Sequence, residues 1–370
     1  MRLRQLGAVA SISVLFCLVA SACTDQSDDA SDDSNGVTGQ QLDSGWSLAN
    51  DLALEQGSLA VADETAVVIG GETDGSIGAH WSVDGFVWEP GEGLPESTDW
   101  HSAAVAGGPR GFVAIASRTG VVPNEAVIVF SRDGSDWEVI DVQDLPEPQV
   151  SWLTDVVAGP DGFVVVGSGY PGNPTFVWFS DDGRTWTDTD MPALDGPLAV
   201  ANDGTGWMAV GGPGDDLTAP SSVFASANGN RWTEVETENP PTIDAVREYF
   251  GTAHFVGSDE TWLLVPAEGG DRTKWASTDN GRSWTEVDFP VGAAVVHPDL
   301  ITDVAVIDGA FVVVGSRDSE EVPDPPALYF SEDANSWQAY RTVADYSGLG
   351  ELGNEIVALD RDGNVFVWSP

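Results

Sequence analysis

The residues best suited to chemistry in this chain stand just before short apolar runs. They are aromatic, imidazole and guanidinium side chains placed where a loop would enter a strand, and two aspartates follow a few residues into such runs. Aromatic rings accompanied by a few polar groups suit the binding of a sugar or a peptide. We therefore predict a ligand-binding set that consists of Trp100, His101, Trp152, Asp155, Arg247, Tyr249, His297 and Asp303.

The aromatic members of this set recur at one place. Trp100 and Trp152 each stand seven residues before the glycine that ends their run, and Tyr249 stands eight before its own. Leu300 occupies the same place in a further run, so packing alone does not require a ring there. The alternative is that each ring covers the end of its own strand.

Signatures of known catalytic machinery are missing from the sequence. It contains no Gly-x-Ser-x-Gly elbow, no His-Glu-x-x-His and no phosphate-binding loop. Paired carboxylates carry little information in a chain with 60 acidic residues. The run at 360–364 has some features of a calcium loop, but its glycine comes too early, and we interpret it as a turn. We predict no catalytic residue, no metal and no cofactor.

The elements that must position these residues are set by a repeated stretch, which we call the repeated turn. It has a small polar residue, an acid or amide two positions on, usually a glycine, and then a tryptophan. Apolar runs flank each copy, which predicts strand, turn and strand. Pairs such as Asp182-Gly183 and Asn228-Gly229 favour two-residue hairpins. The six copies begin at Ser82, Ser131, Ser180, Ser226, Ser277 and Ser331.

The spacing of the copies predicts a β-propeller. Successive serines lie 49, 49, 46, 51 and 54 residues apart, and each interval holds four strand signals, as a propeller blade does. The chain ends on the apolar run 365–369, which has no repeated turn after it. Residues 42–48 resemble the second half of a repeated turn, which is the part that the C-terminal run lacks. We predict seven blades, with the N-terminal strand completing the last one, and six as the alternative. Asp155 and Asp303 should then point toward the entrance of the central channel.

The repeated turn resembles the Asp-box, also called the BNR repeat, of sialidase-like β-propellers. The copy at 277–284 matches the family pattern S-x-D-x-G-x-x-W fully, four copies lack one residue, and the copy at Ser331 has no glycine. We expect Asn335 to supply the left-handed residue in that last copy. In the family the box is a structural turn away from the catalytic face, so the resemblance implies the fold and says little about activity.

The resemblance also raises a hydrolase alternative. Retaining sialidases need an arginine triad, a tyrosine–glutamate nucleophile pair and an acidic residue, and they carry an Arg-Ile-Pro motif, which this sequence lacks. Four arginines, at 118, 247, 272 and 317, fall in loops where a triad would need them. We predict a non-catalytic, membrane-anchored extracellular propeller that binds a glycan, a peptide or an envelope protein; the alternative is a divergent sialidase-like glycoside hydrolase.

The N-terminus reads as a bacterial lipoprotein leader. Residues 1–22 combine two arginines with an apolar segment too short to span a membrane comfortably, and Leu18–Cys23 resembles a lipobox with lipid on Cys23. Residues 23–41 are rich in Asp and Ser and predict a disordered acidic tether before the propeller at 42–370. The expected location is the outer face of the cell membrane, with plain secretion as the alternative.

The charge balance restricts the partners. Sixty acidic residues face 14 basic ones, which gives a formal net charge of −46 at pH 7. Such a surface repels nucleic acid and anionic membranes, so we expect contact with the membrane only through the lipid. Cys23 would be the one cysteine left after removal of the leader, so no internal disulfide can form. We expect a monomer with a glycan or protein ligand.

Overall fold

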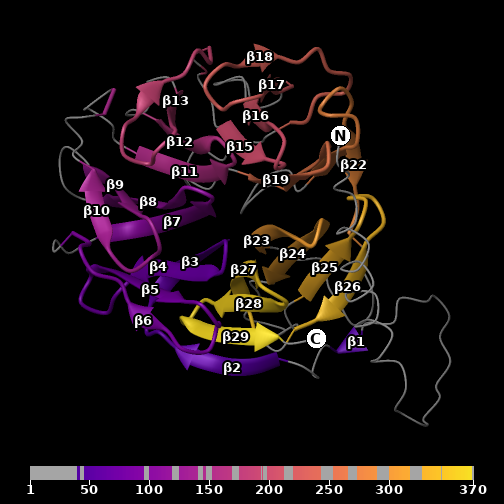
Figure 1. The fold of residues 1–370 in the computed structure, drawn as a ribbon. Helices are drawn as coiled ribbons and strands as arrows, with labels where there is room; N and C mark the ends of the chain where they lie inside the picture. Colours follow the sequence, from indigo (N-terminus) through magenta and orange to yellow (C-terminus); the bar gives the residue numbers. More distant parts are fainter. Residues whose placement is uncertain are drawn as a thin grey trace, which may run out of the picture.

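The computed structural model describes residues 40–41, 46–95, 100–118, 125–140, 145–146, 152–168, 175–192, 194, 198–211, 220–242, 253–265, 273–289, 300–316, 327–342 and 344–368. Within these ranges the structure is built from β-strands arranged as seven small sheets around a central axis (Figure 1). The protein is therefore a seven-bladed β-propeller, as its sequence predicted, and the alternative of six blades is wrong.

Each blade is a meander of antiparallel strands that begins at the axis and runs outward. Blades one to three contain β3 (Glu55–Ala62), β4 (Thr65–Gly71), β5 (Ile77–Ser82), β6 (Glu89–Pro90); β7 (Trp100–Gly108), β8 (Gly111–Arg118), β9 (Glu125–Ser131), β10 (Trp137–Ile140); and β11 (Trp152–Gly159), β12 (Gly162–Ser168), β13 (Thr175–Ser180), β14 (Thr187–Asp188).

Blades four to six repeat this order. They contain β15 (Leu198–Asn202), β16 (Trp207–Gly211), β17 (Ser222–Ser226), β18 (Thr233–Glu234); β19 (His254–Ser258), β20 (Thr261–Val265), β21 (Lys274–Ser277), β22 (Thr285–Val287); and β23 (Leu300–Ile307), β24 (Ala310–Ser316), β25 (Ala327–Ser331), β26 (Gln338–Arg341).

Blade seven closes the ring with both ends of the chain. Its inner strands are β27 (Tyr346–Leu352), β28 (Glu355–Asp360) and β29 (Asn364–Trp368), and its outer strand is the N-terminal β2 (Trp46–Asp51). Trp46 pairs with Trp368 and Asp51 with Asn364, with one bulge between. The predicted closure is confirmed, and β2 covers the edge of β29 that would otherwise be open.

A second N-terminal strand lies outside blade six. Gln40-Gln41 form β1, which runs parallel to β26 and pairs with Tyr340 and Arg341. These two residues fall in the range that the sequence assigned to the tether. The chain therefore contacts two neighbouring blades, six and seven, before it enters blade one.

The repeated turn is held by side chains, and it is longer than predicted. In blade three, β13 ends at Ser180 and β14 begins at Thr187, so the expected two-residue hairpin is wrong. The Ser180 hydroxyl accepts the amide of Gly183 at 2.8 Å, and Asp182 Oδ1 accepts the amides of Arg184 and Thr185 at 2.8 and 2.7 Å. These bonds satisfy backbone donors that a tight hairpin would have paired across the strands.

The left-handed residue of the turn stands three residues before the tryptophan in all six copies. Gly183 has a φ of +75°, and in the copy without glycine the corresponding residue is Ala334, with a φ of +58°. The expectation that Asn335 would take this conformation is wrong, because the spacing to Trp337 and not the residue type decides the position. Asn335 instead donates its backbone amide to Asp333 at 2.9 Å.

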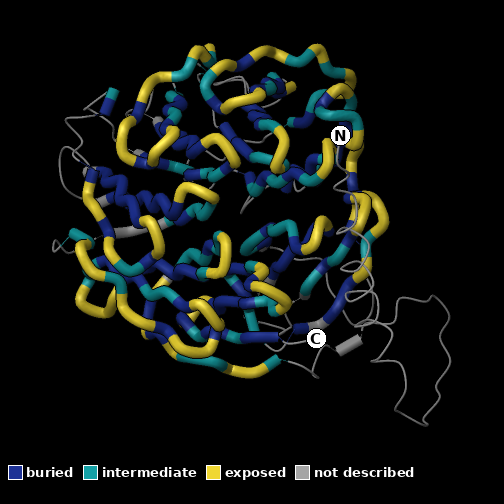
Figure 2. The backbone as a smooth tube through the Cα atoms, viewed as in Figure 1, coloured by how far each residue is buried: buried dark blue, intermediate teal, exposed yellow. Residues whose placement is uncertain are grey.

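The core lies between the blades, where the faces of neighbouring sheets meet. Phe163 and Trp178 of blade three, for example, are fully buried with Ile128 and Phe130 of blade two. Five of the six turn tryptophans donate their indole N–H to the residue in the left-handed conformation, as Trp88 does to Gly85 at 2.8 Å. Figure 2 shows buried strands inside each blade and exposed residues at the turns.

Candidate functional site

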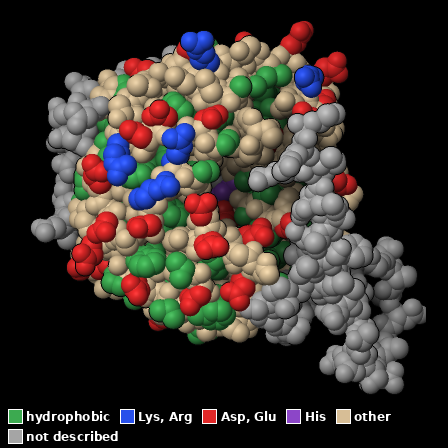
Figure 3. Space-filling view, viewed as in Figure 1, with side chains coloured by type: hydrophobic (Ala, Val, Ile, Leu, Met, Phe, Trp, Pro, Cys, Tyr) green, Lys and Arg blue, Asp and Glu red, His purple; other side chains and the backbone are tan. Residues whose placement is uncertain are grey.

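The centre of the propeller is hollow. A cavity of about 970 Å³ follows the axis and is lined by residues from the inner strands of the blades. The face in view in Figure 3 is hollowed at the same place, with acidic side chains around the opening and a histidine inside. This cavity has the volume typical of small-molecule sites and lies where seven strands converge.

One position on each inner strand recurs around the channel. At this position the residue pairs with an apolar residue of the second strand, as Asp155 does with Val166 and Asp303 with Val314. We call the seven equivalent residues the channel ring. They are Ser58, Ala104, Asp155, Ala199, His254, Asp303 and Gly348.

In blades three and six a bulge lies directly beside the ring residue. In blade three the bulge is at Thr154, whose hydroxyl bonds to the carbonyl of Val166 at 3.2 Å. Thr302 makes the corresponding bond to Val314 at 3.2 Å and also lies 2.6 Å from the carbonyl of Tyr346 in the next blade. Because the bulged residue satisfies the carbonyl that the ladder leaves free, the strand can bend without losing a hydrogen bond.

Asp155 lines the channel, and only one of its two carboxylate oxygens makes a hydrogen bond to a described residue. Its Oδ1 accepts the amide of Val156 at 2.8 Å, and Oδ2 has no partner among the residues that the structure describes. Burial raises the pKa of Asp155 to about 7, against the opposing effect of the Val156 hydrogen bond. Desolvation disfavours the charged form, so at neutral pH this carboxyl is close to half protonated.

Asp303 is tied to the backbone of two blades. Its Oδ1 accepts the amide of Val304 at 2.8 Å, and its Oδ2 accepts the amide of Leu349, in blade seven, at 2.9 Å. Burial raises the pKa of Asp303, while the neighbouring His254 and the two amide hydrogen bonds oppose the rise. Asp303 therefore stabilises the contact between blades six and seven and places a carboxyl beside the imidazole.

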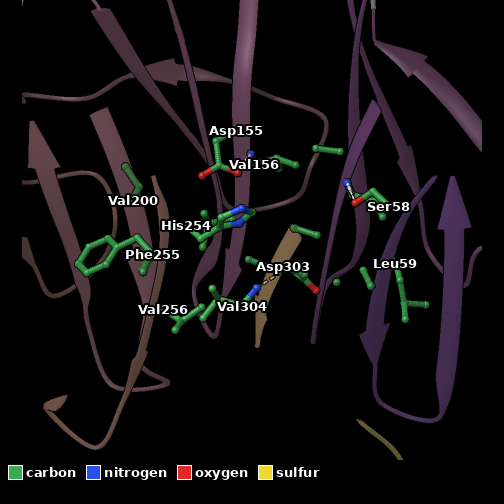
Figure 4. Close-up of a pocket in the computed structure, with 18 of the residues that line it drawn as sticks. Ser58, Leu59, Asp155, Val156, Val200, His254, Phe255, Val256, Asp303 and Val304 are labelled. Atoms are coloured by element: carbon green, nitrogen blue, oxygen red, sulfur yellow. Dashed lines mark hydrogen bonds between the residues drawn. The ribbon is translucent and has the colours of Figure 1, made fainter. Parts of the chain in front are cut away.

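His254 lies between the two carboxyls (Figure 4). Burial lowers the pKa of His254, although the charge of Asp303 and a hydrogen bond to the backbone of Ile301 act in the opposite direction. Its imidazole is therefore mostly neutral at pH 7 and can donate or accept one hydrogen bond in the channel. Ser58 faces this group across the cavity, and its oxygen accepts the amide of Val105 at 3.3 Å.

The structure brings together only part of the predicted ligand-binding set. Asp155 and Asp303 line the channel. Trp100 and His101 lie in β7 and Trp152 begins β11, but their side chains are outside the described part of the structure. Arg247, Tyr249 and His297 fall outside the described residues. The signal, the tether up to residue 39 and Cys23 fall outside them too.

The sequence analysis missed His254, although a signal for it exists. Asp155, His254 and Asp303 each stand four residues before the last residue of their inner strand. The prediction counted back from Gly257 in blade five, whereas β19 ends one residue later, at Ser258. Counting from the Asp259-Glu260 turn would have placed His254 in the channel ring.

The end of the channel near blade seven carries an ion pair. Arg361 lines the cavity, and its Nε lies 3.4 Å from Oδ2 of Asp345. The turn that holds Arg361 is organised by Asp360, which accepts the amides of Asp362 and Asn364 at 3.0 and 2.8 Å. The structure therefore makes the run at 360–364 a turn with its carboxylate engaged by backbone.

Two further observations concern the described residues alone. No group of three or more His, Cys, Asp or Glu side chains in that part of the chain is arranged to hold a metal ion. Within the same residues, no helix has the length and apolar character that crossing a bilayer requires.

The channel wall is chemically simple. Small aliphatic residues, such as Val156, Val200 and Val304, surround a few polar groups. These include one carboxyl with a free oxygen, one neutral imidazole and Asn202, whose buried Nδ2 has no partner among the described residues. Such a wall can accept hydrogen bonds and can place a negative charge beside a ligand. Its one described aromatic member, Phe255, packs instead on Trp262 and Trp284 in the core, at centroid distances of 5.5 and 6.3 Å.

Comparisons with known proteins identify the fold. No protein-family model matches the chain, and a search of the curated proteins finds no similar sequence. Among solved structures, "YCF48 bound to D1 peptide" is similar with a TM-score of 0.55 and 14% identity, covering 90% of this chain and 98% of that one. YCF48 from Cyanidioschyzon merolae gives 0.54 and 14%, covering 88% and 99%. "Structure of YjhT" gives 0.50 and 10%, covering 78% and 97%.

Proposed function

We propose that this protein is a non-catalytic binding propeller whose ligand sits in the central channel against the channel ring. The observation that carries the proposal is the cavity of about 970 Å³ with Asp155, His254 and Ser58 on its wall. Packing does not account for polar groups at these places, because the equivalent positions in other blades are Ala104, Ala199 and Gly348. Asp155 Oδ2 has no partner among the described residues, and a buried polar atom without a partner is costly, so its presence indicates a ligand.

A similar solved propeller supports a binding role. YCF48, a propeller of the same fold, was solved with a bound peptide. The ligand class for this chain is a peptide, a glycan or an envelope protein. We further propose that Cys23 carries lipid and that the propeller lies on the outer face of the cell membrane. The support for the anchor is the Leu18–Cys23 motif followed by an acidic tether.

A hydrolase remains the second candidate because of one observation. Asp155 has its pKa raised to about 7 by burial and stands in the same cavity as Asp303. A protonated carboxyl beside an ionised one is the arrangement that glycosidases use for general acid catalysis. Both oxygens of Asp303 are, however, engaged by backbone amides, so it has no free oxygen to attack a substrate or activate water.

The proposed site can be tested by blocking the channel after folding. Ser58→Cys, in a chain whose native cysteines Cys17 and Cys23 are changed to serine, places a single thiol on the channel wall. The protein is screened against glycan and peptide arrays before and after reaction with a bulky maleimide. We expect a ligand whose binding is lost on reaction.

The matched control carries the thiol in a repeated turn. Ser336 is exposed in the turn of blade six, so Ser336→Cys should react without affecting the ligand. Because the same folded protein is compared before and after modification, instability of a variant cannot imitate the result. Equal binding by blocked and unblocked Ser58→Cys protein would refute a ligand in the channel.

A further inference from the structure

The polar groups of the channel favour one class of ligand over others. Asp155 offers an oxygen without a described partner, Asp303 adds a second carboxyl, and His254 between them is held mostly in its neutral form. Arg361, the one described basic side chain in the lining apart from the imidazole, is paired with Asp345. The site therefore presents two carboxyls and hydrogen-bond acceptors, and the carboxyls become negatively charged when they ionise.

From this arrangement we propose that the channel ring binds a ligand through a cationic nitrogen, a primary ammonium or a guanidinium group, with Asp155 as its direct partner and His254 as a second acceptor. The inference rests on the proposed function and specifies its ligand class. An ammonium on a slender stem fits a wall made of small aliphatic residues. A flat sugar ring would find no aromatic surface in the described lining, because Phe255 is part of the core.

The charged groups around Asp155 decide how such binding depends on pH. The groups that face it across the channel are His254, Asp303 and Arg361; the neighbouring strands contribute the uncharged Ala104 and Val200. A cation favours the ionised carboxylate, so its binding should release the proton that Asp155 carries near neutral pH. Protonation of His254 at lower pH would repel the cation. Both effects therefore weaken cation binding as the pH falls.

The sign and size of the pH effect follow from the ionised fraction of Asp155. A carboxyl with a pKa of about 7 is ionised to about a tenth at pH 6 and about nine tenths at pH 8. Affinity for a cationic probe should therefore rise by about tenfold between these values. For an ordinary surface carboxylate the affinity would be flat over this range, because such a group is already ionised.

The test uses n-butylammonium as the probe and n-butanol as its uncharged counterpart. Binding is followed through the Cε1–H proton resonance of His254, assigned by its loss in His254→Gln. We expect a saturable shift with butylammonium, about tenfold tighter at pH 8 than at pH 6, and none with butanol. Asp155→Asn should weaken binding by about tenfold or more at pH 8 and abolish its pH dependence.

A matched control separates the channel from the acidic surface of the whole protein. Asp161 lies in the exposed turn that joins β11 to β12, and Asp161→Asn removes one carboxylate from the surface. This variant should bind butylammonium as the wild type does. Equal loss in Asp161→Asn and Asp155→Asn would show general attraction to an acidic protein and would overturn the proposal.

Two further outcomes distinguish the inference from the function on which it rests. If butanol binds as well as butylammonium, or Asp155→Asn binds unchanged, the cation preference is wrong. A neutral ligand displaced by blocking Ser58→Cys would then leave the channel as the binding site and refute only its charge preference. A blocked lysine peptide compared with its Nε-acetyl form, and glucosamine compared with N-acetylglucosamine, decide whether the ammonium group belongs to a peptide or to a sugar.

Discussion

Closure of the ring by the N-terminal strand predicts a sharp difference between two truncations. Deleting residues 24–38 removes no described residue of the propeller. Deleting 24–49 removes the pairs of Trp46, Ser47 and Leu48 with β29. It also removes the Trp46 ring, whose centroid lies 5.1 Å from that of Tyr346.

The expected loss can be worked from these contacts. Each ladder hydrogen bond contributes about 1 kcal/mol net, and removal of a half-buried tryptophan ring costs about 2 kcal/mol, below the range for a fully buried one. The total of about 5 kcal/mol is a large share of the stability of an ordinary domain. With an unfolding entropy of about 2.1 cal/mol/K per residue, a propeller of this size should lose about 7 °C in Tm.

Scanning calorimetry of the two truncations provides the assay, and two substitutions on the same strand provide controls. Leu48 is 63% exposed, so Leu48→Ala should leave the Tm within about a degree. Trp46→Ala should lower it by about 3 °C. Deletion of 24–41 separates the small contribution of β1 from that of β2. Equal Tm values for the 24–38 and 24–49 deletions would refute the closing role of β2.

Three other predictions follow from the sequence and the site. Cys23→Ser should move the protein from the membrane fraction to the medium, and unchanged fractionation would contradict lipidation. A fluorogenic sialoside should show no turnover above background, and activity that disappears in Arg247→Ala would favour the hydrolase instead. Asp155→Asn should raise the Tm, because burial lifts the pKa of Asp155 from 3.8 to about 7 and the folded state therefore disfavours the carboxylate. This gain in Tm should grow as the pH rises from about 4 to 7 and should level off above pH 7. A gain that does not change with pH would contradict the assigned pKa.

The sequence was most informative where one residue type has one structural role. A serine, a left-handed residue and a tryptophan recur because the serine oxygen accepts a turn amide and the indole N–H donates to the turn carbonyl. Their spacing therefore predicted the blades, and the unmatched halves at the two ends predicted the closure. The turn itself was misread, because a dipeptide such as Asp182-Gly183 has the same letters in a short hairpin and in this longer turn.

The site was predicted less completely, for a geometric reason. Asp155 and Asp303 were found because they lie at a fixed distance from the aromatic position on their strands. His254 was missed because a one-residue error in the end of β19 moves every side chain to the other face of the strand. The ends of strands are the least certain part of any such prediction. Register inside the blade, which only the structure shows, was needed to align the ring.

The channel ring shows where a propeller can vary its chemistry without changing its fold. Along each inner strand, most side chains pack between neighbouring blades, and their apolar character is fixed by that core. Five of the seven ring residues line the cavity. The position holds a glycine, an alanine, a serine, an aspartate or a histidine with the same pairing to the second strand. Because the pairing to the second strand does not depend on which of these residues is present, the polar side chains found at this position indicate what the protein binds. Two carboxyls beside a neutral imidazole, on neighbouring or nearly neighbouring blades, are an arrangement suited to a cation.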